Sequence, residues 1–466
     1  MMNPELLDKI IKAYDIRGLV ENEITPDFTF AVGSAFARLL ELEREPATVI
    51  IGEDMRPTST QLADAFSDGI TSQGMDVIRI GLASTDQLYF AAGYLNFPGA
   101  MFTASHNPAA YNGIKLCKSG ARPIGKESGL VWIRNAIADG MPISNRPVGT
   151  ETSRDMLQEY VEYLFSLFTH DFGTGRNLKI AIDAGNGMAG HTAPAVMSRI
   201  SAEVSPIYFE LDGSFPNHEA NPIAPENLVD LQRLVKKRRA DIGLAFDGDA
   251  DRCFLVDEKG SLVAPSALTA LIAERELKKR PGSGIIYNLI SSKAVPEVIL
   301  ENGGTPLRSR VGHSYIKKMM EESGAIFGGE HSGHFYFKEF WRADSGMLAA
   351  LHAIAALQES AEPLSKLLEP YQRYVSSGEI NSVVKDQGAA VTFIENHYRE
   401  LSDKNSLNLE FDHLDGLTVT SDNWWFNVRA SNTEPLLRLN AEGDTEAEMV
   451  KIRDIANFDH LGFGIA

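Results

Sequence analysis

The sequence predicts an α/β protein of three similar mixed-sheet domains, followed by a smaller α+β domain at the C-terminal end. Three observations support this fold class. Apolar strand-like runs alternate with helical patterns over most of the chain, which is typical of mixed or parallel sheets covered by helices. The pattern changes after residue 375, where strand-like runs surround a single helical pattern. The length of 466 residues corresponds to three or four domains.

The first domain opens with alternating helices and strands. Thr25 and Pro26 form a strong helix start, an N-cap followed by proline in the first turn, so we expect a helix over residues 28–40. A strand over residues 48–51, a helix over 59–73 that stops at Gly74, and a strand over 76–80 follow. Comparable strands are expected within the next two domains at residues 178–182, 241–246 and 284–287. The α/β order therefore recurs three times.

The closing domain is expected to carry strands at residues 380–384 and 417–419 and a helix over about 389–401. We expect the four domains to cover residues 1–150, 151–256, 257–370 and 371–466, with linkers near Pro147, Asp257 and Pro370. Residues 458–466 show no clear helical pattern, and no role is assigned to them.

Composition and charge exclude several classes of protein. The net charge is −19, from 63 acidic and 44 basic residues, which argues against nucleic acid as a partner. No apolar run approaches the ~20 residues of a membrane span. The N-terminus, with Glu5 and Asp8, does not match a signal peptide. The two cysteines, Cys117 and Cys253, are expected to fill the core of a protein in a reducing cytoplasm.

The most informative segment covers residues 103–108. Ser105 follows an apolar run over residues 98–102 and precedes His106 and the turn-forming Pro108. A buried strand that delivers a nucleophile onto a tight turn has this pattern, and so does an ordinary Ser/Asn/Pro turn. Serine needs a base, a cation or a metal nearby to act as a nucleophile, and Lys115 follows within reach. The segment therefore predicts either a reactive serine or a simple turn.

Three carboxylates recur at every second residue, at Asp247, Asp249 and Asp251, directly after a strand-like run. Three hard oxygen ligands on one loop suit an octahedral Mg²⁺ that keeps positions for water or a phosphate oxygen. A calcium EF-hand is the obvious rival, because Glu258 stands at its twelfth position. It fails because Arg252 occupies the position that requires glycine, and because a strand precedes the loop. A solvated acidic turn is disfavoured, since carboxylates this dense repel one another without a cation.

Two further loops carry polar side chains. Glycines at residues 328 and 329 allow a sharp turn, and Glu330, Ser332 and His334 alternate, so their side chains would share one face if the segment is extended. A carboxylate placed there can accept hydrogen bonds from two sugar hydroxyls. The second loop follows an aromatic run and offers an arginine, two hydroxyls and an amide as a phosphate cradle. Its residues are Arg429, Ser431, Asn432 and Thr433. Each loop alone also reads as an ordinary polar turn.

Together and in this order, the four segments resemble the phosphoserine, metal-binding, sugar-binding and phosphate-binding loops of the α-D-phosphohexomutase superfamily. The resemblance covers nearly the whole chain, since residues 12–18, 183–187, 212–217 and 311–314 are similar to further family signatures. The opening segment with Tyr14 and Arg17, and the loop over residues 329–334, look most like phosphomannomutase/phosphoglucomutase enzymes. The resemblance implies four domains around a central cleft.

The resemblance also implies an activity. A phosphoryl group would move reversibly between O1 and O6 of one hexose, mannose or glucose or both, through phosphorylated Ser105 and a hexose 1,6-bisphosphate intermediate. Mg²⁺ would be held by Ser105 and the three aspartates, flanked by Arg252 and Lys115, with Lys115 or His106 as general acid/base. Glu330 and Ser332 would hold the sugar hydroxyls O3 and O4. The remaining implied substrate contacts are Tyr14, Arg17, His313, His334, Arg429, Ser431, Asn432 and Thr433.

One departure and several alternatives stay open. The family often has a basic residue where this chain reads Asn288 to Ser292, and Lys293 is a candidate replacement. Phosphoglucosamine mutase, a phosphoserine-type hydrolase and a non-catalytic phosphosugar-binding protein are the alternative functions. The expected partners are small-molecule sugar phosphates, with no nucleic acid and no membrane, bound by a cytoplasmic monomer or homodimer. A cationic funnel inside the acidic shell would admit them. Its members would be Arg17, Lys115, Arg252 and Arg429.

Overall fold

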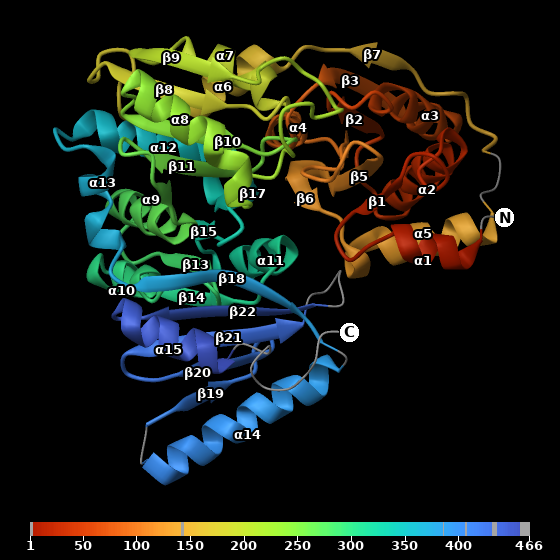
Figure 1. Cartoon of the computed structure of the whole chain (residues 1–466). Coiled ribbons are helices and arrows are strands. Elements are labelled where there is room, and N and C mark those ends of the chain that lie inside the picture. Colours follow the sequence, from red (N-terminus) through yellow and green to blue (C-terminus); the bar gives the residue numbers. More distant parts are fainter. Residues whose placement is uncertain (1–2, 141–143, 385, 406–407, 431–435, 457–466) are drawn as a thin grey trace.

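The computed structural model describes residues 3–140, 144–384, 386–405, 408–430 and 436–456. Over these ranges the chain forms three mixed sheets and one antiparallel sheet. The four sheets follow one another in an arc, with the first (red to orange) and the fourth (blue) at its two ends (Figure 1). In the part of the chain so described, no helix is long and apolar enough to cross a membrane.

The first sheet has the strand order β1-β5-β4-β2-β3-β7, with β6 paired to β5. The expected helix start is confirmed, because the Thr25 hydroxyl accepts a hydrogen bond from the Phe28 N–H at 3.3 Å and Pro26 is the first helical residue. The second expected helix ends before Gly74, whose φ of +84° breaks it. The elements are α1 (Pro4–Ile10), β1 (Ile16–Leu19), α2 (Pro26–Leu42), β2 (Thr48–Glu53), α3 (Ser59–Ser72), β3 (Asp76–Leu82), α4 (Thr85–Tyr94), β4 (Gly99–Phe102), β5 (Tyr111–Lys118), β6 (Arg122–Pro123), α5 (Val131–Asp139) and β7 (Glu151–Ser153).

The second and third sheets each have five strands, ordered β12-β11-β10-β8-β9 and β14-β13-β15-β16-β17. The strands expected at residues 178–182, 241–246 and 284–287 are confirmed as β8, β10 and β13. The elements of the second sheet are α6 (Leu157–Ser166), β8 (Leu178–Asp183), α7 (Ala189–Met197), β9 (Ala202–Ile207), α8 (Val229–Arg238), β10 (Ile242–Phe246), β11 (Cys253–Asp257) and β12 (Leu262–Val263). Those of the third are α9 (Pro265–Lys279), β13 (Gly284–Asn288), α10 (Ala294–Glu301), β14 (Thr305–Ser309), α11 (His313–Ser323), β15 (Phe327–Gly329), β16 (Phe335–Phe337), β17 (Ala343–Asp344), α12 (Gly346–Glu359) and α13 (Leu364–Leu367).

The three mixed sheets share one topology. In each, three parallel strands are followed by an antiparallel strand: β3-β2-β4 by β5, β9-β8-β10 by β11, and β14-β13-β15 by β16. The connection between the last parallel strand and that antiparallel strand carries Ser105 in the first sheet, the three aspartates in the second and residues 330–334 in the third. Three of the predicted functional loops therefore occupy equivalent positions in a repeated fold.

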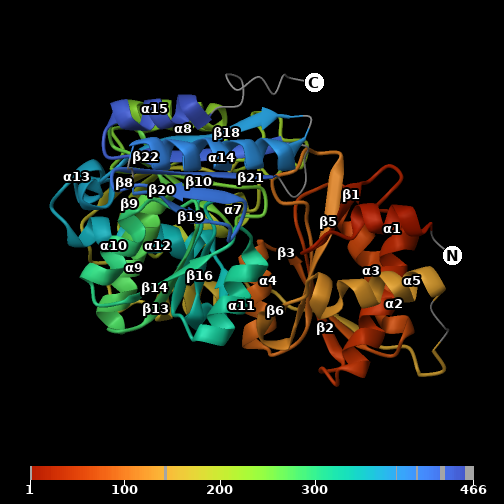
Figure 2. The same ribbon diagram turned by 90° about the horizontal axis from the view of Figure 1, so that it is seen from below.

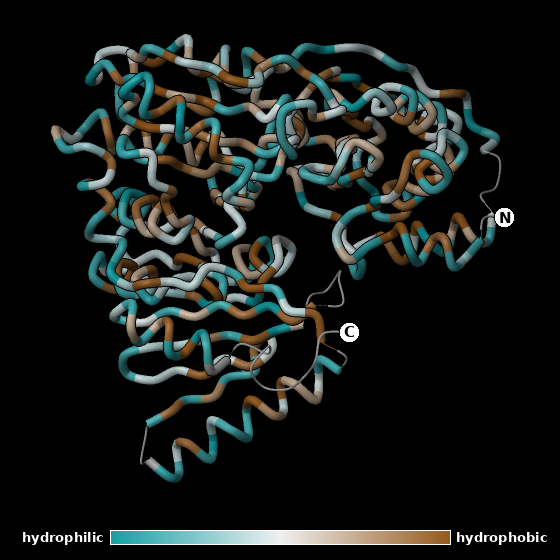
Figure 3. Tube along the Cα trace, viewed as in Figure 1, coloured by the Kyte–Doolittle hydropathy of each residue, from teal (hydrophilic) through white to brown (hydrophobic). Residues whose placement is uncertain are grey.

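The fourth sheet is antiparallel throughout, in the order β18-β22-β21-β20-β19. It confirms the smaller α+β domain, with a helix longer than expected and a first strand that begins earlier. The elements are β18 (Val375–Val383), α14 (Gln387–Asn405), β19 (Glu410–Asp412), β20 (Leu417–Thr420), β21 (Trp424–Ala430), β22 (Leu436–Gly443) and α15 (Glu446–Ala456). Polar and apolar residues alternate along helix α14 (Figure 3). Its buried residues include Ala390, Ile394 and Tyr398, as expected for a helix with one buried face.

One apolar cluster joins the first three sheets, although the first domain also has a separate cluster between its sheet and α2, α3 and α5, and the fourth domain has a cluster of its own. One cluster of buried side chains joins Met101 of β4, Leu244 of β10 and Leu351 of α12. In the fourth domain, Ile394 of α14 and Phe426 of β21 belong to a separate cluster. A view from below shows the first domain at one side and the other three packed together (Figure 2).

Candidate active site

Ser105 lies in the connection from β4 to β5, in a backbone conformation that L residues rarely adopt. Its φ is +51°, and its N–H donates to the Thr103 hydroxyl at 2.9 Å. Left-handed backbone at a serine persists only where the surroundings hold it. The buried Arg56 provides that support by donating hydrogen bonds to four carbonyl oxygens of the loop, including that of Ser105 at 2.9 Å.

The aspartate loop of the second sheet packs directly onto this turn. A Cβ at Gly248 would lie 2.4 Å from the Ser105 carbonyl oxygen, so the close approach requires glycine. The Ser105 hydroxyl donates to Asp247 Oδ2 at 2.9 Å. One carboxylate oxygen from each of Asp247, Asp249 and Asp251 lies within 4.8 Å of the others, and all three side chains are buried. The structure thus brings together the two segments that are 142 residues apart in sequence.

Two cations balance part of this charge. Lys115 Nζ donates to Asp249 Oδ2 at 2.7 Å and to Asp251 Oδ2 at 2.6 Å, and Arg252 Nε donates to Asp247 Oδ2 at 2.9 Å. Burial disfavours the Lys115 ammonium, but the two carboxylates outweigh it and hold the pKa of Lys115 well above its ordinary value. Burial, helped by the two neighbouring aspartates, raises the pKa of Asp247 to about 7.

The aspartates fit a divalent metal ion. Among the residues the structure describes, Asp249 Oδ1 is buried and accepts no hydrogen bond, and Asp251 Oδ1 is buried with His334 Nε2 3.5 Å away. The second oxygen of each carboxylate accepts a hydrogen bond from Lys115. Buried acceptor oxygens without donors are costly unless a cation binds them. Hard carboxylate oxygens are the ligands that Mg²⁺ prefers. These three residues, with the Ser105 hydroxyl beside them, therefore form a group that can hold a metal; a second, overlapping group consists of Asp251, His334 and Asp344.

His106 is the second candidate acid/base, and it lies on the nucleophile itself. Its Nδ1 is 3.2 Å from the Ser105 hydroxyl oxygen, and the Arg252 guanidinium hydrogen-bonds to the same nitrogen. Burial and the neighbouring Arg252 charge hold the pKa of His106 well below its ordinary value, so the ring is neutral.

The segment over residues 330–334 forms a tight turn and is not extended. Gly333 has a φ of +85°, and its N–H donates to the Glu330 carbonyl at 3.1 Å. The three side chains still gather, because the turn folds them inward: Ser332 Oγ lies 2.9 Å from His334 Nδ1, which is 3.7 Å from Glu330 Oε2. The three side chains therefore come together through the turn, and not through an extended segment.

The carboxylate of Glu330 is buried and already bound to the protein. Its Oε1 accepts the Gly312 N–H at 3.0 Å, and its Oε2 accepts the Tyr336 hydroxyl at 2.6 Å. His334 Nε2 lies 3.5 Å from Asp251 Oδ1, so this turn adjoins the aspartate loop. Burial disfavours the His334 charge, yet the Asp251 carboxylate outweighs it and raises the pKa of His334.

Arg429 of β21 is buried, and its guanidinium has partners within its own domain. Nη2 donates to Glu379 Oε2 at 2.6 Å and Nη1 donates to Asn440 Oδ1 at 2.9 Å. Burial lowers the pKa of Arg429, although the Glu379 charge opposes this. Ser431, Asn432 and Thr433 lie outside the described residues.

The remaining predicted contacts lie around the serine loop and the third sheet. Arg17 donates to Asp15 Oδ2 at 2.6 Å and to the Asn107 side chain. The Tyr14 ring packs edge-on against Tyr315 of α11, with centroids 6.3 Å apart. His313 begins α11, but its side chain is outside the described part of the chain. Lys293 does not stand free as a replacement phosphate contact, because its Nζ donates to the Asp422 carbonyl at 3.0 Å.

Several residues of the site carry no sequence signal of their own. Arg56, Thr85 and Asp344 are single polar residues at the ends of strands or helices, and nothing in the local pattern separates them from surface residues. Asp344 pairs with the buried Lys317 at 2.7 Å, next to His334. Only their three-dimensional neighbours identify them.

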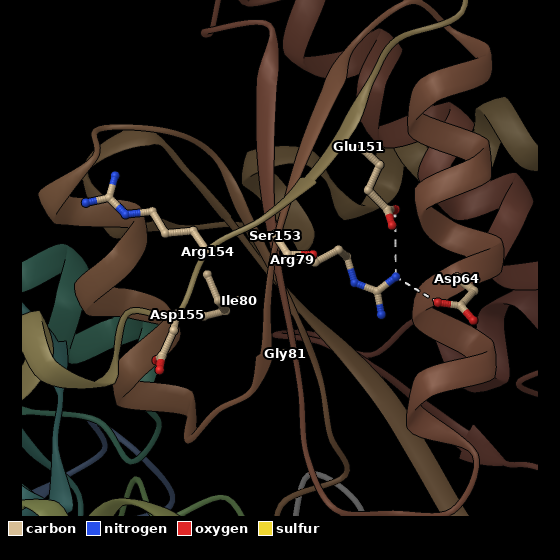
Figure 4. A pocket seen from close by; sticks show the side chains of 8 residues that line it. All are labelled: Asp64, Arg79, Ile80, Gly81, Glu151, Ser153, Arg154 and Asp155. Carbon is tan, nitrogen blue, oxygen red and sulfur yellow. Dashed lines mark hydrogen bonds and ion pairs between the residues drawn. The ribbon is translucent and has the colours of Figure 1, made fainter.

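A separate open hollow of about 440 Å³ lies at the edge of the first sheet, beside β3 and β7 (Figure 4). Arg79 crosses it and is held by Asp64 at 2.8 Å and by Glu151 at 3.8 Å. None of the predicted site residues lines it. It is therefore not the site of the chemistry above.

Comparison with known proteins agrees with this geometry. Models of the phosphoglucomutase/phosphomannomutase alpha/beta/alpha domains I, II and III match residues 8–141, 158–260 and 264–374, and the model of the C-terminal domain matches residues 379–456. The chain is 39% identical over 444 residues to the "phosphohexose mutases" of Xanthomonas campestris, covering 95% of this chain and 96% of that protein. It is 37% identical over 451 residues to a phosphomannomutase of Escherichia coli K12, covering 95% and 96%.

A solved structure is similar over the same extent. The crystal structure of a phosphoglucomutase/phosphomannomutase family protein from Burkholderia thailandensis matches with a TM-score of 0.86 and 30% identity, covering 97% of this chain and 96% of that one. All four domain models, in order, and relatives above 30% identity over almost the full length confirm the resemblance seen in the sequence. The chain belongs to the phosphoglucomutase/phosphomannomutase family of the α-D-phosphohexomutase superfamily.

Proposed function

We propose that the protein is a phosphohexomutase, an isomerase that interconverts hexose 1-phosphate and hexose 6-phosphate through phosphorylated Ser105 and a hexose 1,6-bisphosphate intermediate. The observation that carries this proposal is the contact of the Ser105 hydroxyl with Asp247 at 2.9 Å, inside a buried group of three aspartates, Lys115 and Arg252. Phosphoryl transfer depends mainly on positioning and on neutralising charge, and this arrangement provides both.

The metal we propose is Mg²⁺, held by Asp247, Asp249, Asp251 and an oxygen on Ser105. When bound, it neutralises charge on the transferring phosphoryl group. The protein's own part is to hold that group in place. Arg252 Nη2 lies 3.3 Å from the Ser105 hydroxyl and is positioned to bind a phosphoryl oxygen there, while Lys115 keeps two aspartates oriented.

The geometry favours His106 over Lys115 as the acid/base. The Lys115 ammonium is held between two carboxylates, which stabilises its protonated form. The neutral His106 ring lies 3.2 Å from the Ser105 hydroxyl oxygen, within reach of a proton on the serine or on a sugar hydroxyl that replaces it.

The sugar and the phosphate that does not react would be held by the third and fourth domains. Ser332 and His334 lie next to the metal loop, and Glu330 supports this turn while keeping lone pairs for sugar hydroxyls. Arg429, with Ser431, Asn432 and Thr433, is the proposed phosphate contact, and Tyr14, Arg17 and His313 line the approach. A phosphate that binds Arg429 must share it with Glu379 or displace it.

Mannose and glucose phosphates are the proposed substrates, because the relatives at 36–38% identity are named phosphomannomutase. Glucosamine phosphate is the alternative sugar. We further propose that the enzyme is cytoplasmic, since its two cysteines are free and buried, as in proteins of a reducing compartment. The proposed oligomeric state is a monomer or a homodimer.

The test measures the phosphoryl carrier directly. Intact-mass analysis should find a fraction of the protein heavier by one phosphate, and Ser105→Ala should lose this species. Ser105→Ala should also lose about 10³-fold or more in turnover with mannose 1-phosphate and glucose 1-phosphate, because covalent catalysis goes with the hydroxyl. Ser34→Ala, which removes another buried hydroxyl far from the site, is the matched control.

Three outcomes would contradict the proposal. Near-normal turnover of Ser105→Ala would exclude the phosphoserine mechanism. Release of free phosphate without isomer would show a hydrolase, and binding of sugar phosphates without either product would show a binding protein. Parallel assays with glucosamine 1-phosphate would decide between the sugars.

A further inference from the structure

We infer that Thr85 is a positioning residue for the metal ligand Asp249, so that the first turn of α4 sets the geometry of the metal site from a different domain. The inference rests on the proposed function, because it assumes a metal at the three aspartates.

Thr85 donates two hydrogen bonds to Asp249 in the aspartate loop. Its hydroxyl donates to Asp249 Oδ2 at 2.6 Å, and its backbone N–H donates to the Asp249 carbonyl oxygen at 3.0 Å. Both residues are fully buried. A β-branched side chain has few rotamers, so the threonine hydroxyl keeps its direction without a large loss of entropy. The side chain of Thr85 therefore holds the side chain of Asp249, and the backbone of Thr85 holds the backbone of Asp249.

The two oxygens of Asp249 have different environments as a result. Oδ2 accepts from the Thr85 hydroxyl and from Lys115 Nζ at 2.7 Å, whereas Oδ1 is buried and has no hydrogen-bond donor among the described residues. Two donors on one oxygen fix the rotation of the carboxylate about its χ2 bond. The oxygen without a donor is then the one left available to a metal ion, and partners of a ligand commonly orient it in this way.

Thr85 is itself anchored against movement. Ser84 caps α4 by accepting the Gln87 N–H at 3.3 Å. The next residue, Asp86, is fully buried and accepts from Tyr160 Oη of α6 at 2.7 Å and from Ser345 Oγ, the cap of α12, at 2.6 Å. The turn that carries Thr85 is therefore tied to helices beside the second and third sheets, and the position of Asp249 depends on how these domains pack together.

The test uses the full chain and Mn²⁺ alone, titrated by electron paramagnetic resonance. Thr85→Val keeps the shape of the side chain and removes the donor, and it should weaken Mn²⁺ binding by about 10-fold to 100-fold. Thr85→Ser restores the donor and should bind within about threefold of the wild type. Thr29→Val is the matched control, because Thr29 is equally buried and donates only to the Pro26 carbonyl of its own helix. Asp249→Asn assigns the signal to this site.

The outcomes separate the inference from the proposed function. A wild-type chain that does not bind Mn²⁺ at this site would overturn the metal proposal and the inference together. A wild type that binds, with a folded Thr85→Val that binds within twofold of it, would overturn the inference alone. A purely structural role would lower the melting temperature of Thr85→Val and leave its Mn²⁺ affinity unchanged. Thr85→Ala, which places no methyl group against the carboxylate, gives the same comparison if Thr85→Val does not fold.

Discussion

Replacing Arg56 by lysine is the sharpest test of how the reactive serine is held. Arg56 Nη1 donates to the carbonyl oxygens of Pro108 and Tyr111, both at 2.9 Å, and Nη2 donates to those of Ser105 at 2.9 Å and Asn107 at 2.6 Å. One guanidinium thus holds both ends of the turn. Arg56→Lys keeps the charge that pairs with Asp54 but removes the planar fork.

The expected loss follows from these contacts. A lysine ammonium has three N–H donors on one nitrogen, so it cannot serve four acceptors that approach from two nitrogens of the fork. Each hydrogen bond from a charged donor is worth about 1.5–3 kcal/mol, and each buried carbonyl oxygen left without a donor costs about 1–3 kcal/mol. A shift of about 1 Å in the nucleophile reduces the rate by roughly 10²-fold. We therefore expect kcat/KM to fall by about two orders of magnitude.

Three measurements check this expectation: kcat/KM with glucose 1-phosphate, the thermal midpoint, and amide hydrogen exchange over residues 103–113. Exchange should accelerate in this loop, because its carbonyl contacts are lost. Arg38→Lys is the control, since Arg38 forms an exposed pair with Glu41 at 3.2 Å and contributes little to stability. If Arg56→Lys keeps kcat/KM within threefold of the wild type and loop exchange is unchanged, Arg56 does not position Ser105.

Three further predictions concern metal, phosphate and pH. Asp251→Asn should weaken Mg²⁺ activation by about tenfold or more while the fold is kept, as measured by the Mg²⁺ dependence of turnover after chelation. Activity that a strong chelator leaves unchanged would contradict the metal site. Glu379→Gln removes the carboxylate that competes with phosphate for Arg429. It should lower KM roughly threefold to tenfold with a smaller change in kcat. An unchanged or higher KM would show that Glu379 does not compete. Burial disfavours the His218 charge, but Asp183, 3.0 Å away, outweighs it and raises the pKa of His218. This pair therefore stabilises the fold fully below the unfolded histidine pKa of about 6.5 and loses its contribution as pH rises through the higher folded pKa. Thermal midpoints between about pH 6 and pH 9 should fall less steeply in His218→Gln than in the wild type, and parallel curves would refute the assignment.

Local patterns in the sequence were enough to predict the main helices and strands and the chemistry of the loops. Local periodicity and capping predict the helix start at Thr25, the strand before the aspartates and strand β13. They also predict the α+β character of the last domain. The alternating aspartates indicated a metal loop, because the ligand types and their spacing lie within one short segment. Local patterns report local structure, and these features need no distant partner.

Which of these segments meet, and which residues hold them, depends on how the sheets and domains pack. The sequence shows no repeat that would reveal the equivalent positions of the three loops, since the topology repeats while the residues differ. The pattern at residues 330–334 left open whether this segment is extended or turns, and the antiparallel pairing of β15 and β16 requires a tight turn there. The support given by Arg56 to Ser105, and by Thr85 to Asp249, joins residues 49 and 164 positions apart. Such contacts arise from sheet order and domain packing, and single polar residues carry no local pattern that could predict them.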